Sequence, residues 1–261
     1  MCRRSARLCN NALWMVPTCI VCMVVSCVSR SGAEEIDYPD FSYPFGLELN
    51  GDAESVVARE ESVLRIVPAR EGQGGTFFYH TQLPVTNFHT EFSFRFSEVG
   101  GIHDCDTEVG GDGLVFAIQP VSATFGGRDG GGRLAFYDVS PSIGVEFDTF
   151  RNLEHADVTS NHLGVNTNGN TESHVVVDVA ERFDNGKKWF AWIDYDGTTL
   201  EVRANQSGVR PDAPLLKYPI DIPAVIDSDT AYVGFTAATG GAIANHDILS
   251  WRFEGQPSGD P

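Results

Sequence analysis

The sequence is poor in basic residues: 18 Lys and Arg stand against 36 Asp and Glu, which gives a net charge of −18 over 261 residues. This shortage excludes recognition of a nucleic-acid backbone as the main function, because such sites are built on clustered Lys and Arg. Runs of Leu, Ala, Glu and Lys are also lacking, which excludes a helical bundle or a coiled coil. With 42% apolar and 11% aromatic residues, the chain is nevertheless too apolar to be disordered.

Cysteine is scarce beyond the N-terminal segment. Five of the six cysteines lie within the first 27 residues, and Cys105 is the one that follows. A single thiol cannot close an intramolecular disulfide, so the main part of the chain is not a disulfide scaffold. We expect Cys105 to be buried as a small apolar residue.

The first 33 residues have the layout of a secretory signal. Arginines at positions 3, 4 and 7, an apolar stretch at 12–28 and small residues at 31–33 precede the first acids. Residues 24–27 also resemble a bacterial lipobox, so a lipid anchor at Cys27 is the alternative to cleavage after Ala33. No later apolar run is long enough to span a membrane. The sequence therefore predicts a secreted or extracytoplasmic protein, and loss of four bases with the signal deepens the charge to −22.

The remaining chain shows the period-two pattern of β-strands. Phe92, Phe94 and Phe96 alternate with polar residues, and 114–118 is a continuous apolar run suited to a strand covered on both faces. Asp196-Gly197 predicts a two-residue hairpin turn, and 53–66 is the one segment with a helical alternative. Further strands are predicted at 175–179, 189–195, 200–202, 231–235 and 248–253. Residues 34–254 should form one all-β antiparallel sandwich, followed by a disordered tail at 255–261.

One predicted strand, around residues 144–149, carries two carboxylates on the same face. Alternation places Glu146 and Asp148 opposite Val145 and Phe147, and neighbouring carboxylates repel each other unless a cation lies between them. An all-oxygen set suited to Ca²⁺ consists of a backbone carbonyl with Asp148, Asn152 and Asp157. A mixed set suited to Mn²⁺ or a similar transition ion consists of Glu146, Asp148, Asp157 and His162. A solvated acidic strand face would contain the same residues.

The order and spacing of these residues resemble the metal loop of the legume (L-type) lectins. The resemblance extends over about residues 40–254, through motifs at 47–51, 75–79, 111–116, 130–134, 145–162, 234–240 and 246–253. It implies a concanavalin-like jelly-roll sandwich with a single domain. Two positions depart from the family pattern: Gly111 stands where the family usually has Ala, and Val158 where it usually has Pro.

The resemblance also implies a shallow carbohydrate site above a pair of metal ions. Ca²⁺ would be held by Asp148, the Phe150 carbonyl, Asn152 and Asp157, and Mn²⁺ or a similar ion by Glu146, Asp148, Asp157 and His162. A cis peptide is implied after Gly111. The sugar would be bound by Asp112, Gly132, the Phe150 ring and Asn152, with Gly240, Gly241 and Ala242 lining the fourth loop. The implied partners are a glycan and, in a homodimer, a second copy paired through the back sheet.

Two other functions are compatible with this architecture. Laminarinase-like glycoside hydrolases also place Glu-x-Asp on a strand, but here no carboxylate follows Asp148 before Glu154, where a second catalytic Glu is needed. A non-carbohydrate adhesion or scaffold module is the other alternative. We predict a metal-dependent lectin rather than an enzyme. Asn205-Gln206-Ser207 is in addition a sequon for N-glycosylation, which matters in a eukaryotic secretory path.

Overall fold

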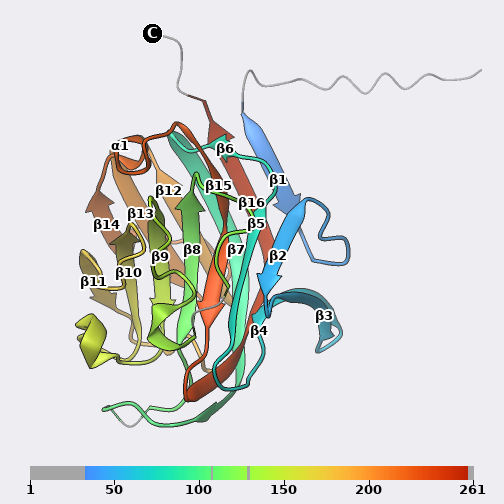
Figure 1. Cartoon of the computed structure of the whole chain (residues 1–261), viewed down its shortest axis with the longest axis vertical. Helices are drawn as coiled ribbons and strands as arrows, with labels where there is room; N and C mark the ends of the chain where they lie inside the picture. Colours follow the sequence, from blue (N-terminus) through green and yellow to red (C-terminus); the bar gives the residue numbers. More distant parts are fainter. Residues whose placement is uncertain (1–32, 107, 128–129, 258–261) are drawn as a thin grey trace, which may run out of the picture. The chain divides into compact units, whose positions relative to one another are not determined.

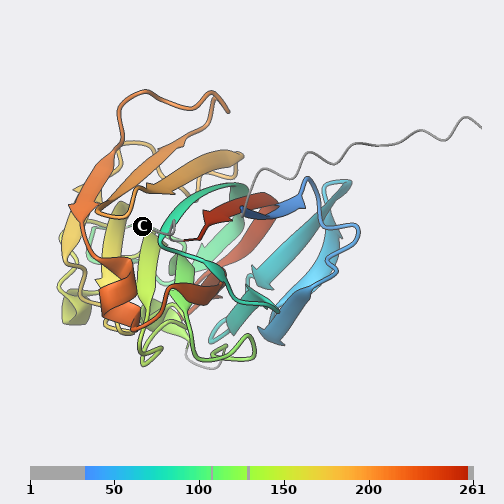
Figure 2. The same ribbon diagram turned by 90° about the horizontal axis from the view of Figure 1, so that it is seen from above.

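The period-two pattern produces two antiparallel sheets within the residues that the computed structural model describes, 33–106, 108–127 and 130–257. The predicted signal and the Cys27 anchor lie outside these residues. The first sheet, called sheet A, has the strand order β14 (Leu216–Pro219), β13 (Thr199–Asn205), β12 (Trp189–Tyr195), β7 (Asn87–Gly101), β16 (Ala242–Gln256), β4 (Glu61–Val67), β3 (Glu54–Ala58), with β1 (Glu34–Tyr38) also paired to β16. The first strand therefore runs beside the last, as the blue and dark red ribbons show (Figures 1 and 2).

The second sheet, called sheet B, contains the acidic strand. Its order is β11 (Val175–Asp178), β10 (His162–Thr167), β9 (Ile143–Asp148), β8 (Gly113–Gln119), β15 (Thr230–Ala238), β5 (Gly74–Tyr79), β2 (Leu47–Gly51), and β6 (Leu83–Pro84) pairs with β15. Short helical segments lie in the connections: η1 (Gly131–Arg133), η2 (Leu153–His155) and α1 (Ile222–Ile226). The all-β prediction is confirmed.

Aromatic side chains fill the space between the two sheets. Phe92 and Phe94 of β7 alternate inward, as predicted, and meet rings of sheet B: the Phe92 and Phe235 centroids lie 4.8 Å apart, and those of Phe94 and Phe147 5.2 Å apart. Both pairs are edge-to-face, an arrangement that adds about 0.5–1.5 kcal/mol to the burial of the rings. This aromatic core fixes β9 and β8 in sheet B, whose ends carry the candidate site.

Sheet B is covered on both faces. Alternate residues of β8 enter two different apolar clusters: Leu114 and Phe116 face the main core, whereas Val115 packs in a smaller cluster with Leu134 and Phe136. The loop that follows β8 therefore lies over the outer face of the sheet. This double burial explains the continuous apolar run that the sequence shows at 114–118.

Three local expectations need correction. Residues 53–66 are not helical but form β3 and β4, joined by a tight turn in which Arg59 and Glu60 both have positive φ, 51° and 67°. The turn at Asp196-Gly197 does join β12 to β13, yet it is longer than two residues, because Tyr195 pairs with Leu200. Its Asp196 side chain accepts hydrogen bonds from the N–H groups of residues 198 and 199, so the carboxylate and not the backbone alone closes the turn. The last strand ends at Gln256, two residues beyond position 254, where the sequence places the end of the domain.

Candidate functional site

Strand β9 presents its acidic face at one end of sheet B. Val145 and Phe147 point into the main core, so Glu146 and Asp148 lie on the opposite face, as alternation predicts. Both carboxylates are nevertheless only 3% exposed, because the loops around the strand end cover them. Asp148 pairs with Gly113 of β8 on one side and with His162 of β10 on the other. The register alone therefore brings three predicted site elements side by side.

Asp112 is anchored through its backbone to two neighbouring segments. The peptide bond between Gly111 and Asp112 is cis, as predicted. The Asp112 N–H donates to the carbonyl of Ala238 at 3.0 Å, and its carbonyl accepts from the N–H of Thr149 at 2.8 Å and from the Thr149 hydroxyl at 3.0 Å. These bonds hold the side chain at the junction of β8, β15 and the loop after β9.

The Asp112 carboxylate is buried with its hydrogen-bonding capacity incompletely used. It is 3% exposed, and Oδ2 has no hydrogen-bond partner among the described residues. Burial raises its pKa to about 7; a backbone hydrogen bond from Gly240 opposes the shift, and the negative charges of Asp157 and Glu154 add to it. A buried acceptor without a partner is costly, so this oxygen is prepared for a donor that the chain itself does not provide.

Gly132 and Asn152 meet where the loop after β8 approaches the loop after β9. A Cβ atom on Gly132 would lie 2.3 Å from Oδ1 of Asn152, so the absence of a side chain is what lets the amide occupy this place. Asn152 is 8% exposed, and its Oδ1 also has no hydrogen-bond partner in the described part of the chain. Its backbone N–H donates to Oδ2 of Asp157 at 2.7 Å, which closes the loop around the amide.

The remaining residues of the predicted carbohydrate site lie around Asp112. A Cβ on Gly240 would lie 3.3 Å from Oδ2 of Asp112, and one on Gly111 would lie 3.0 Å from the Cβ atoms of Phe150 and Ala242. The Gly241 carbonyl accepts the N–H of Ile102 at 3.0 Å, so a further loop borders this side. The structure thus places Asp112 and Gly111 against Gly240, Phe150 and Ala242, and Gly132 against Asn152.

The predicted metal ligands form a buried acidic cluster around one imidazole. Nε2 of His162 lies 3.3 Å from Oε1 of Glu146 and 4.0 Å from Oδ1 of Asp157. Oδ1 of Asp148 accepts the N–H of Phe150 at 2.8 Å, and Oε1 of Glu146 also accepts the Ser173 hydroxyl. The side chains named from the sequence are therefore gathered in one place.

Electrostatics in this cluster disfavour the charged carboxylates. Burial, together with the nearby charges of Asp157 and Glu146, raises the pKa of Asp148 well above its usual value, although His162 opposes the shift. Burial likewise raises the pKa of Asp157 to about 6. Burial alone would lower the pKa of His162, but the hydrogen bond with Glu146 and the surrounding carboxylates raise it to about 9. Without another cation, the imidazolium supplies the positive charge.

The side chains as they stand do not form a metal-ligand arrangement. Within residues 33–106, 108–127 and 130–257, no group of three or more His, Cys, Asp or Glu side chains is placed so that it could hold a metal ion. The His162 ring points its Nε2 at carboxylate oxygens, which is the geometry of an ion pair.

Several supporting residues carried no recognisable signal in the sequence. Arg182 donates to the carbonyl of Thr149 at 2.9 Å and to Asp184 at 2.7 Å, and thereby fixes the segment that holds Asp112. Asp104 accepts the N–H of Arg151 at 3.2 Å. The contacts of Arg182 and Asp104 with the loop after β9 do not follow from spacing along the chain.

The prediction that Cys105 is buried was wrong. Its thiol is free and exposed, and the buried side chain in this loop is that of Asp104.

Comparison with protein families gives a match over nearly the whole described chain. The model described as legume lectin domain matches residues 33–261. Among curated proteins, the L-type lectin-domain containing receptor kinase VIII.1 of Arabidopsis thaliana is 32% identical over 212 residues, which are 76% of this chain and 28% of the relative. A lectin-like protein of Arabidopsis thaliana is 31% identical over 214 residues, 72% of this chain and 76% of the relative. The chain thus spans little more than a quarter of the receptor kinases VII.1 and VIII.1.

Solved structures share the architecture. The basic winged bean lectin, crystallised with Tn-antigen, matches with a TM-score of 0.69 and 28% identity over 85% of this chain and 98% of that chain. The winged bean acidic lectin complexed with methyl-α-D-galactose matches with a TM-score of 0.70 over 87% of this chain and 99% of that chain. At 22% identity, the second likeness shows the fold alone.

Proposed function

The chain belongs to the legume lectin family, and we propose that it is a metal-dependent carbohydrate-binding protein whose site is centred on Asp112. The observation that carries this proposal is the buried Asp112 carboxylate, whose Oδ2 has no partner within the described residues and lies beside Gly240. Sugar hydroxyls are donors of the kind that this oxygen lacks. The basic winged bean lectin, which is 28% identical to this chain, was crystallised with Tn-antigen, and this supports a ligand of the same class.

Each residue of the site has a distinct role in this proposal. Asp112 accepts hydrogen bonds from sugar hydroxyls, and Gly132 and Asn152 donate to them through a backbone N–H and a side-chain amide. The Phe150 ring, which is partly exposed, offers a face to the C–H groups of the sugar. Gly240, Gly241 and Ala242 form the adjoining wall. Because backbone hydrogen bonds already fix Asp112, little conformational entropy is lost when a sugar binds.

The acidic cluster fits a pair of divalent cations in its chemistry. The carboxylates of Glu146 and Asp148 are buried there and that of Asp157 is partly buried, with the single imidazole of His162 beside Glu146 and Asp157. Oδ1 of Asn152 is an acceptor without a partner among the described residues. Ca²⁺ would be held by Asp148, the Phe150 carbonyl, Asn152 and Asp157, and Mn²⁺ or a similar ion by Glu146, Asp148, Asp157 and His162. Bound cations would neutralise these carboxylates and fix the Asn152 amide for the sugar. His162 has to lose its proton and turn from its ion pair toward the metal.

The remaining parts of the proposal concern location and partners. We propose a glycan as the ligand, export as a secreted or lipid-anchored protein, and a homodimer through the back sheet, sheet A. In the part of the chain that the structure describes, no helix is long and apolar enough to cross a membrane.

A non-carbohydrate adhesion or scaffold module is the second candidate function. One observation favours it: no metal-ligand arrangement is formed among the described side chains, so the cluster could equally persist as a His162 ion pair. Such a module would keep the fold and bind neither sugar nor cation at this end of sheet B.

We do not propose the hydrolase alternative. A retaining glycosidase needs two carboxyl groups about 5–5.5 Å apart that both reach the substrate. Glu146 is instead held by His162 and Ser173, and Asp148 accepts the Phe150 N–H beneath the surface. The carboxylates of β9 are thus engaged with the protein and not presented to a substrate.

A glycan array on the purified full chain tests the proposed function. We expect binding to a limited group of glycans, its loss in EDTA, and its return when Ca²⁺ and Mn²⁺ are added together. Binding that is indifferent to EDTA would contradict the metal requirement. A folded protein that binds no glycan even with both metals would favour the scaffold module.

A further inference from the structure

The turn that follows β13 has a side chain at its centre. Oδ1 of Asn205 accepts hydrogen bonds from the N–H groups of Ser207 at 3.0 Å and Gly208 at 3.1 Å, and Nδ2 donates to the carbonyl of Val209 at 2.7 Å. Residues 207–210 are exposed. This is an Asx turn on the surface, built from five consecutive residues, 205–209, and therefore able to form before the sandwich does.

The same residues are the sequon Asn205-Gln206-Ser207, whose asparagine is an acceptor for N-glycosylation when it lies in a surface loop of an exported protein. We propose that Asn205 carries an N-linked glycan, whose first residues lie on the aromatic side chains of β12 and enter the cavity beside them. This inference rests on the proposed export, with a eukaryotic secretory path as its route and not the lipid anchor, and it does not rest on the carbohydrate site.

The modification is a balanced group transfer from an oligosaccharide linked to a lipid diphosphate. Nδ2 of Asn205 forms a bond to C1 of the first sugar, the bond from C1 to the diphosphate oxygen breaks, and one amide proton leaves while the lipid diphosphate departs. No oxidant or reductant is needed. The second N–H of the amide remains and continues to donate to the Val209 carbonyl, so the turn keeps its internal bonds.

Strand register determines where the glycan begins. Asn205 pairs directly with Phe190 across β12 and β13, so the two side chains lie on the same face of sheet A with Cβ atoms ~5 Å apart. Phe190 and Trp192 are stacked, with centroids 6.4 Å apart and an interplanar angle of 18°. A Cβ on Gly208 would lie 3.2 Å from the Phe190 ring, so the turn itself borders this aromatic surface.

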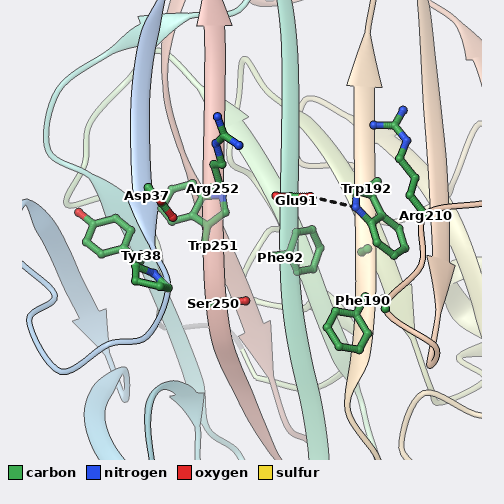
Figure 3. Close-up of a pocket in the computed structure, with 13 residues that line it drawn as sticks. Asp37, Tyr38, Glu91, Phe92, Phe190, Trp192, Arg210, Ser250, Trp251 and Arg252 are labelled. Carbon is green, nitrogen blue, oxygen red and sulfur yellow. Dashed lines mark hydrogen bonds between the residues drawn. The ribbon is translucent and has the colours of Figure 1, made fainter. Parts of the chain in front are cut away.

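These side chains form one wall of a cavity of about 560 Å³ on the outer face of sheet A. Asp112 precedes β8 of sheet B, so the cavity and the proposed carbohydrate site belong to different sheets. Figure 3 shows Phe190 and Trp192 on β12, with Ser250 on β16 and Tyr38 on β1, beyond the intervening strand β7. Glu91 and Arg210 add polar groups along the wall, where Glu91 accepts the Trp192 ring N–H at 3.0 Å. Aromatic faces beside hydrogen-bonding groups suit a sugar, which has apolar C–H faces and a rim of hydroxyls.

Two consequences follow for this face. Nζ of Lys188 lies 5.3 Å from the centroid of the Phe190 ring, so the first sugar competes with the lysine for that ring. A second copy that pairs through sheet A has to leave the part formed by β12 and β13 uncovered.

The modification is tested on the full chain secreted from a eukaryotic host. We expect a mass decrease after peptide N-glycosidase treatment, with the deamidation label at Asn205, in the unchanged chain and in Ser207→Thr, but not in Ser207→Ala. Asn185→Gln is the matched control: Asn185 lies exposed in a similar turn, with its Oδ1 accepting the Lys187 N–H at 3.1 Å, yet no hydroxyl residue stands two positions later. This variant should be modified like the unchanged chain.

A second version of the full chain, with an established secretory leader fused before Met1, separates the two parts of the argument. Glycosylation in this version alone would contradict export by the chain's own signal and keep the assignment of Asn205. An unmodified Asn205 in both secreted versions would overturn the inference.

The position of the glycan is tested by thermal melts before and after enzymatic deglycosylation of the folded protein. We expect the unchanged chain to lose about 2–4 °C in Tm, the shift that accompanies ~1 kcal/mol in a domain of this size. Phe190→Ala should lose less than half of that on deglycosylation, because the ring on which the glycan lies is missing. Each variant is compared with its own deglycosylated form, so the effect of the substitution itself cancels. An equal loss in both would show that the glycan does not lie on Phe190.

Discussion

Acidic side chains gather at the loop end of sheet B and on the outer face of sheet A, but their pKa values shift in opposite directions in the two regions. On sheet A, Asp194 accepts hydrogen bonds from His89 at 2.8 Å, Arg203 at 2.9 Å and Arg210 at 2.6 Å. Although burial opposes it, these partners lower the pKa of Asp194, and the hydrogen bond from Lys217, followed by that from Arg203, lowers the pKa of Glu201. In the sheet B cluster, burial raises the pKa of Asp112 and Asp157 to about 7 and about 6.

The fold neutralises these two acids of sheet A with its own side chains, whereas it leaves those at the end of sheet B available to a ligand. On sheet A, Asp194 and Glu201 each accept hydrogen bonds from arginine or lysine, so these two carboxylates are neutralised without a ligand. At the end of sheet B three carboxylates share one imidazole, and acceptor atoms of Asp112 and Asn152 lack partners in the described part of the chain. Strongly perturbed acids of the second kind are typical of binding sites.

Exchanging one acid in each region for its amide should have the largest effect. Asp112→Asn should weaken glycan binding at least ~100-fold, about 2.7 kcal/mol, because an amide cannot accept hydrogen bonds at both positions. The same variant should have an unchanged or higher Tm, because a buried charge is removed. Asp194→Asn should keep glycan affinity and lower Tm by about 3 °C, because charge-assisted bonds are lost. Titration calorimetry and thermal melts on both variants give the four values.

The two variants serve as controls for each other. If Asp112→Asn unfolded the protein while Asp194→Asn impaired glycan binding, the assignment of the two regions would have to be exchanged. Retained glycan affinity in a folded Asp112→Asn would place the carbohydrate site elsewhere.

Acid pH should separate the two regions next. The pKa of His162 is raised to about 9 and that of Asp157 to about 6, so a metal ion has to displace a proton from His162 at pH 7 and a second proton from Asp157 below pH 6. Affinity for Mn²⁺ should therefore fall as the pH falls from 9 to 5, by about tenfold per unit for each proton displaced. Affinity for Ca²⁺, whose proposed ligands do not include His162, should fall chiefly below pH 6. Calorimetric titrations with each metal between pH 5 and 9 measure this slope.

The sheet A network should be insensitive over the same range. Asp194 and Glu201 have folded-state pKa values below their unfolded values of 3.8 and 4.5, so their contribution to stability is present above those values and is lost only as the pH falls further. The raised pKa of Asp157 has the opposite effect on stability. Burying the carboxyl group costs less when it is protonated, so this group stabilises the fold as the pH falls. The metal-free protein should thus be at least as stable at pH 5 as at pH 7. A constant metal affinity, or a metal-free protein that melts at pH 5, would contradict the comparison.

Much of the fold was predictable because side-chain periodicity reports burial directly. The alternation of Phe92, Phe94 and Phe96 marked the core face of β7, and the apolar run at 114–118 marked a strand buried on both faces. The turn at Arg59 and Glu60 was missed because neither residue type signals positive φ. Its conformation is imposed by the pairing of Val56 with Val63 and their neighbours, which acts across the hairpin and not within the turn.

The candidate site was predictable in its residues but not in its state. Spacing and resemblance named Asp112, Asn152 and His162, and the structure gathers them because β8, β9 and β10 are adjacent. That His162 forms an ion pair with Glu146 depends on rotamers and local charge, which no spacing encodes. The supports from Arg182 and Asp104 depend on loop geometry for the same reason. So does the exposure of Cys105, which lies beside the buried Asp104 in that loop.

The smallest expected effect comes from a single methyl group. In Gly132→Ala the new Cβ would lie 2.3 Å from Oδ1 of Asn152, so the amide has to move, and glycan affinity should fall by ~10-fold while the fold is kept. Gly100→Ala is the matched control, since Gly100 likewise lacks a positive φ and its Cβ would lie 3.5 Å from the Ile243 side chain, an ordinary contact. Equal glycan affinities for the two variants would show that Asn152 does not contribute through the position that Gly132 leaves open. A loss of affinity confined to Gly132→Ala would show that the position of the Asn152 amide, and not only the Asp112 carboxylate, matters for ligand binding at this end of sheet B.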